Sequence, residues 1–95
     1  MSKPMIHAKY PLAGTSHFLE IVIFQPEPDP ESTNNDYCCD CRISGPEYVK
    51  TFHAYGIDQL QCVWLALRRI RDEISGFEEN TKLKCEYCYF QEFEK

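Results

Sequence analysis

The segment from residue 55 to residue 70 constrains the fold most, because it predicts the one long helix of the chain. Gly56 interrupts an extended pattern, and Asp58 suits the N-cap, since its carboxylate can accept a hydrogen bond from a free first-turn amide. An almost unbroken apolar run follows and ends in arginines. We therefore expect a helix within residues 57–75, with Gly76 as its C-cap glycine.

One side of this helix should lie on a sheet. At about 100° per residue, the apolar side chains form a single stripe. The stripe comprises Leu60, Val63, Trp64, Leu67, Ile70 and Ile74. Leu65 points away from it. Because a fully solvated helix rarely carries a leucine at such a position, either the C-terminal segment or a partner should cover Leu65.

Four stretches before the helix have the composition or the alternation of β-strands: residues 6–10, 17–25, 37–44 and 48–55. In the third stretch, Cys39, Cys41 and Ile43 fall on one face, and Cys38 and Asp40 fall on the other. Such alternation is typical of a half-buried strand. The last two stretches are separated by a short turn at residues 45–47, which predicts a hairpin.

These elements predict an α+β fold in a single domain of residues 1–95. About four antiparallel strands should form a meander, with the long helix packed on one face. Residues 1–5 should be a loose arm. Residues 83–90 should form a last strand or a tail after a turn at residues 78–81.

An acidic, proline-rich loop is expected at residues 26–36. It holds three prolines at every second position and four acids without a base, which are Glu27, Asp29, Glu31 and Asp36. The formal net charge of the chain is −5. A negative chain repels phosphate backbones, which argues against nucleic-acid binding, and it attracts a basic protein partner. A purely solvated acidic surface is the plainer interpretation.

The chain has six cysteines but no recognisable secretion signal, so we expect reduced thiols and a cytoplasmic location. No apolar run approaches the roughly 18 residues of a membrane span. Two Cys-x-x-Cys pairs, Cys38 with Cys41 and Cys85 with Cys88, could hold zinc or act in redox chemistry. Because Cys38 and Cys41 should face opposite sides of one strand, we predict neither a metal nor another cofactor.

Catalytic motifs are not evident. The three histidines have no local pattern that ties them to a nucleophile, and the four glycines are scattered rather than gathered in a phosphate loop. We therefore do not expect an enzyme.

The spacing Gly56-Ile57-Asp58, Gln61 and Leu65-Ala66-Leu67 resembles a family of small, uncharacterised bacterial proteins. Their helix signature is Gly-[Val/Ile]-Asp-x-x-Gln-Ala-Leu-x-Leu-Ala-Leu, and their preceding strand reads Trp-x-Cys-x-Tyr-x-Ile-x-Gly. The resemblance covers roughly residues 17–75, and the chain departs from it at Cys62 and Val63. It implies an antiparallel meander followed by a helix, and it implies no activity.

Three classes of function follow as hypotheses. The first is a non-catalytic binding protein, in concrete form an immunity-like or antagonist protein for a basic bacterial partner. Its contact residues would be Glu27, Asp29, Glu31, Asp36 and Leu65. The second is a four-cysteine zinc or thiol-redox protein. The third is a small enzyme or ligand carrier with its pocket between helix and sheet. The oligomeric state stays open, a homodimer included.

Overall fold

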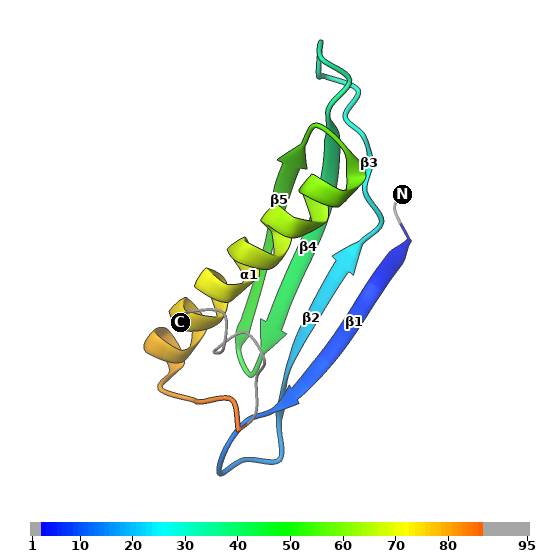
Figure 1. Cartoon of the computed structure of the whole chain (residues 1–95). Helices are drawn as coiled ribbons and strands as arrows, with labels where there is room; N and C mark the ends of the chain where they lie inside the picture. The colour runs from blue at the N-terminus through cyan, green and yellow to red at the C-terminus, as the bar shows by residue number, and fades with distance from the viewer. Residues whose placement is uncertain (1–2, 87–95) are drawn as a thin grey trace.

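In the computed structural model, which describes residues 3–86, a five-stranded antiparallel sheet carries one helix along one face (Figure 1). The elements are β1 (Pro4–Pro11), β2 (Phe18–Phe24), β3 (Glu27–Pro28), β4 (Tyr37–Gly45), β5 (Tyr48–Gly56) and α1 (Gln59–Thr81). The predicted α+β class is thereby confirmed.

The sheet is a meander with one addition from the acidic loop. β1 pairs with β2, β2 with β4, and β4 with β5, all antiparallel. The short β3 also pairs with β4, through Glu27 opposite Cys38 and Pro28 opposite Tyr37. One edge of β4 is paired along its whole length with β5. The other edge of β4 is therefore shared by β2 and β3. The segment expected to be all loop thus contributes a fifth strand.

Both ends of the sheet differ from expectation. β1 begins at Pro4 rather than at Ile6, so Pro4 and Met5 belong to the sheet and not to a loose arm. The β1–β2 register shifts between Pro4 and Ile6. At the other end, Cys85 forms a single antiparallel bridge with Leu12. The remainder of the expected last strand, from residue 87, lies outside the described residues.

Asp58 is the N-cap of α1, as predicted, and its Oδ1 accepts a hydrogen bond from the Gln61 backbone N–H at 2.7 Å. The predicted end of the helix at Gly76 was wrong, because the helix continues through Gly76 to Thr81. Lys82 is the C-cap, with a left-handed φ of 63°, and its N–H donates to the Glu78 carbonyl. The expected turn at residues 78–81 is helical.

The buried face of α1 shares Ile70 and Ile74 with the predicted stripe but differs from it elsewhere. It comprises Cys62, Ala66, Ile70, Glu73, Ile74 and Phe77. Near the helix start, a Cβ on Gly56 would lie 2.6 Å from the Cys62 backbone nitrogen, so the helix backbone sits almost on the end of β5. Only small side chains fit at such a close approach, and Leu60 and Trp64 are left exposed.

Between α1 and the sheet lies one core, lined by the inward side chains of β2, β4 and β5. Cys39, Cys41 and Ile43 all point into it, which confirms the predicted alternation. The core thiols donate to backbone carbonyls, Cys39 to Phe24 and Cys62 to Ala54, both at 3.2 Å. Cys38, Cys39, Cys41 and Cys62 are free thiols. Within the described residues, α1 is not long and apolar enough to cross a membrane.

Candidate functional site

The N-terminal half of α1 presents large apolar side chains to solvent. Leu60 is 80% exposed, Ile57, just before the helix, is 72% exposed, and Trp64 is 55% exposed. Leu60 and Trp64 are four residues apart and therefore neighbours on the helix surface. Single exposed apolar residues are ordinary, but a cluster of large ones marks a surface that gains free energy when a partner covers it.

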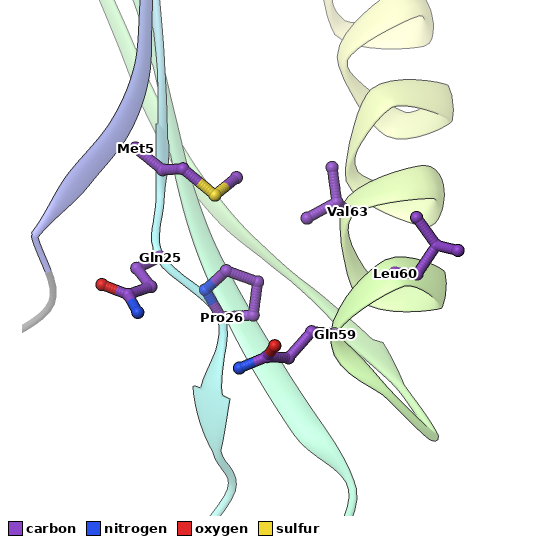
Figure 2. Close-up of a pocket in the computed structure, with 6 residues that line it drawn as sticks. All are labelled: Met5, Gln25, Pro26, Gln59, Leu60 and Val63. Atoms are coloured by element: carbon purple, nitrogen blue, oxygen red, sulfur yellow. The ribbon is translucent and has the colours of Figure 1, made fainter.

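A groove borders this apolar surface. Its volume is about 460 Å³, and it is lined by Met5, Gln25, Pro26, Gln59, Leu60 and Val63. Figure 2 shows Met5 of β1 and Val63 of α1 directed toward one another across the gap, with Pro26 and Gln59 near its end. The groove exists because β1 lies farther from α1 than β4 and β5 do, and α1 packs mainly on those two strands.

The acidic loop begins where the groove ends, since Pro26 lines the groove and Glu27 follows it. Two of its four predicted contact residues help to fold the loop. Asp29 Oδ1 accepts a hydrogen bond from the Glu31 backbone N–H, and Asp36 Oδ2 accepts one from the Ser32 hydroxyl. The side chains of Glu27 and Glu31 are exposed. They are therefore the acids best placed to meet a partner.

Figure 1 places the acidic loop and the N-terminus of α1 at the same end of the molecule. We refer to the exposed apolar residues Ile57, Leu60 and Trp64, the groove, and the loop acids Glu27 and Glu31 together as the N-terminal helix surface. It combines exposed apolar side chains near the start of α1 with two exposed acids of the adjoining loop, of which Glu27 is directly opposite Cys38 in the sheet.

Leu65 does not belong to this surface. It is half-buried and packs against the core, so the side of α1 that carries it is not left open. The exposed apolar side is that of Leu60 and Trp64, which the sequence assigned to the sheet. A signal for the true orientation was present in the small residues Cys62 and Ala66, which are spaced four apart and mark the side of closest approach.

The opposite, open face of the sheet holds the described side chains that could bind a metal. Cys38 and Cys41 lie on opposite faces of β4, as the alternation predicted, and Cys88 lies outside the described residues. Cys38 instead lies with Asp40 and His53, whose ligand atoms are all within 4.8 Å of one another. Burial, followed by the charge of Asp40, raises the pKa of the Cys38 thiol to about 11.

Comparison with known proteins gives a family and no activity. No curated protein and no solved structure matches the chain. One family model matches residues 11–91. The match includes β2 to β5 and α1, and only the last residue of β1. The chain therefore belongs to the family described as "Domain of unknown function (DUF6968)".

Proposed function

We propose that this protein is a non-catalytic binding domain that docks one basic protein partner on the N-terminal helix surface. The observation that carries the proposal is the exposure of Leu60 and Trp64 beside the groove. An apolar side chain of the partner would enter between Met5 and Val63, and Leu60 and Trp64 would cover its flanks.

The free energy of binding favours contacts made by large apolar side chains such as Leu60 and Trp64. Binding energy at protein interfaces is concentrated in a few central apolar or aromatic residues, tryptophan prominent among them. Here Trp64 is 55% exposed on this surface, with the Arg68 guanidinium 5.0 Å from the centroid of its ring. The arginine stacks on the ring and limits its rotamers, so less conformational entropy is lost when a partner packs against it.

Charge selects the class of partner. The chain carries a net charge of −5, and the exposed residues Glu27 and Glu31 belong to the loop that follows the groove residue Pro26. Opposite charge accelerates encounter and suppresses acidic competitors, whereas the apolar contacts hold the complex. A basic partner with an exposed apolar side chain satisfies both conditions. An immunity-like inhibitor of a basic bacterial toxin is the concrete form of this function.

The test is a capture experiment with the tagged full chain, followed by binding kinetics with the captured protein. Wild type should retain one basic partner in a stoichiometric amount, and higher salt should weaken retention. Leu60→Ser should lower the affinity by about tenfold or more, as expected for a central contact. Val49→Ser is the matched control, because Val49 is 70% exposed but lies on β5, away from the groove.

The charge contribution needs its own pair of variants. Glu27→Lys with Glu31→Lys should slow association by about tenfold at low salt and flatten its salt dependence. Glu79→Lys with Glu86→Lys makes the same change in net charge outside the N-terminal helix surface and should alter the rate much less. Equal effects of the two pairs, or an unchanged affinity in Leu60→Ser, would contradict the proposed surface.

A further inference from the structure

Three side chains of different chemistry meet on the open face of the sheet, opposite α1. Cys38 and Asp40 are two residues apart on β4 and share its outward face, and His53 of β5 is the direct cross-strand partner of Asp40. Antiparallel pairing holds directly opposite residues close together, so the backbone itself places the three side chains. The arrangement needs no loop to be ordered first.

The spacing of the three ligand atoms is close to that of a tetrahedral ion. His53 Nδ1 is 2.7 Å from Asp40 Oδ1, and Cys38 Sγ is 3.8 Å from the same oxygen. Around zinc, bond lengths of about 2.3 Å to sulfur and about 2.0 Å to oxygen or nitrogen separate sulfur from oxygen by about 3.5 Å and oxygen from nitrogen by about 3.3 Å. The sulfur–oxygen distance would have to shorten by about 0.3 Å and the oxygen–nitrogen distance to lengthen by about 0.6 Å, shifts that small side-chain rotations can supply, and the third pair of ligand atoms is within 4.8 Å.

The donor set also has the right chemistry. A thiolate, an imidazole and a carboxylate together match borderline divalent ions such as Zn²⁺, whereas Mg²⁺ and Ca²⁺ prefer oxygen donors alone. The local field is negative as well, because Asp40 and Asp29 both act on Cys38. A divalent cation would offset this charge.

The surroundings leave room for an ion and a fourth ligand. The side chains of His53 and Asp40 are 57% and 49% exposed, and Cys38 is half-buried. Tyr55 lies directly opposite Cys38 and flanks the cluster. Three protein ligands with an accessible fourth position are typical of zinc sites that bind water or an exogenous group.

We propose that Cys38, Asp40 and His53 form a binding site for one zinc-class divalent ion on the open face of the sheet. The fourth position is taken by water or by a donor atom of another molecule. The site differs from the two Cys-x-x-Cys pairs of the sequence, since it uses only Cys38 from them. The exposed apolar residues of the N-terminal helix surface lie on the helix side of the sheet, whereas its acid Glu27 is directly opposite Cys38 and adjoins the proposed site.

Co²⁺ is the probe, because a cobalt thiolate gives a near-ultraviolet charge-transfer band that oxygen and nitrogen ligands do not give. Chelator-treated, reduced full-length protein should bind one Co²⁺ per chain with this band, and Zn²⁺ should displace it. Cys38→Ser should abolish the band, and His53→Gln should weaken Co²⁺ binding by about tenfold or more, by analogy with lost metal-site contacts. Circular dichroism checks that both variants are folded.

Two matched controls assign the ligands. His7 pairs with the carboxylate of Glu20 at 3.5 Å on the same face of the sheet. His7→Gln should leave Co²⁺ affinity unchanged. Cys88→Ser should leave the band unchanged. Absence of the band in wild type, its persistence in Cys38→Ser, or its loss in Cys88→Ser would each overturn the proposal, and none of them bears on partner binding at the N-terminal helix surface.

Discussion

At the residue scale, Glu73 is the one charged side chain among the described residues that the core almost encloses, at 8% exposure. Its carboxylate bonds to Lys50 Nζ at 2.8 Å and to Arg69 Nε at 2.9 Å. Lys50 comes from β5, so the carboxylate ties the helix to the sheet. Burial alone would raise the pKa of Glu73, but the two cations outweigh it and lower the pKa below its ordinary value.

A pH dependence of stability follows from this lowered pKa. The ionised carboxylate stabilises the fold above the unfolded-state pKa of about 4.3, and this contribution is lost as the pH falls through the lower folded-state pKa. We expect Glu73→Gln to lower the free energy of unfolding by about 1–2 kcal/mol at neutral pH, since Lys50 and Arg69 are half-exposed and water screens them.

Urea denaturation of wild type and Glu73→Gln across the acid range measures this effect. The difference in free energy should shrink as the pH falls below about 4, because the variant resembles the protonated acid. Glu79→Gln on the exposed face of α1 serves as the control and should change little. A constant difference at all pH values would show that Glu73 acts through packing rather than charge.

At the scale of the element, the length of α1 is set by Phe77 rather than by Gly76. Phe77 is fully buried and meets the Tyr48 ring edge-on, with 5.1 Å between centroids. Burying a phenylalanine contributes about 2–3 kcal/mol, which exceeds the cost of about 1 kcal/mol for glycine inside a helix. The helix therefore continues past the residue that usually ends one.

Gly76→Ala should stabilise the protein by about 0.5–1 kcal/mol, because alanine favours the helix and no heavy atom lies within 4 Å of the added Cβ. Gly56→Ala is the contrasting variant and should destabilise strongly, since its Cβ would meet the Cys62 backbone. Denaturant midpoints measure both changes. If Gly76→Ala destabilised the protein, Gly76 would have to be a left-handed C-cap, which alanine disfavours, and α1 would end there.

These elements also show which parts of the structure the sequence could predict. Alternation in residues 37–44 and the Asp58 cap depend on local geometry, and both predictions were confirmed. The buried face of α1 depends on how closely two backbones approach, and close approach favoured Cys62 over Leu60. The pairing of Asp40 with His53 depends on the register of β4 and β5, which the two turn residues between Gly45 and Tyr48 set and which a turn predicted only as residues 45–47 left undefined.

At the scale of the whole molecule, three core thiols report how the protein opens. Cys39 and Cys41 belong to β4 and Cys62 belongs to α1, and all three are buried. If helix and sheet separate only on global unfolding, an alkylating reagent should label the three at equal rates, and urea should accelerate labelling equally. Mass spectrometry of the peptides resolves each site. Labelling of all three thiols faster than the rate set by global unfolding would reveal a separate opening of α1.

One edge of the sheet resists addition of another strand. Pro4 and Pro11, at the two ends of β1, lack backbone donors, and the strand is irregular between Pro4 and Ile6. Beyond Pro11, the edge is already occupied, since the Glu86 N–H donates to the Pro11 carbonyl and the Ala13 N–H to that of Lys84. Breaks of this kind prevent sheets of neighbouring molecules from joining edge to edge. In a crowded solution, fibre growth from this side of the molecule would therefore be disfavoured.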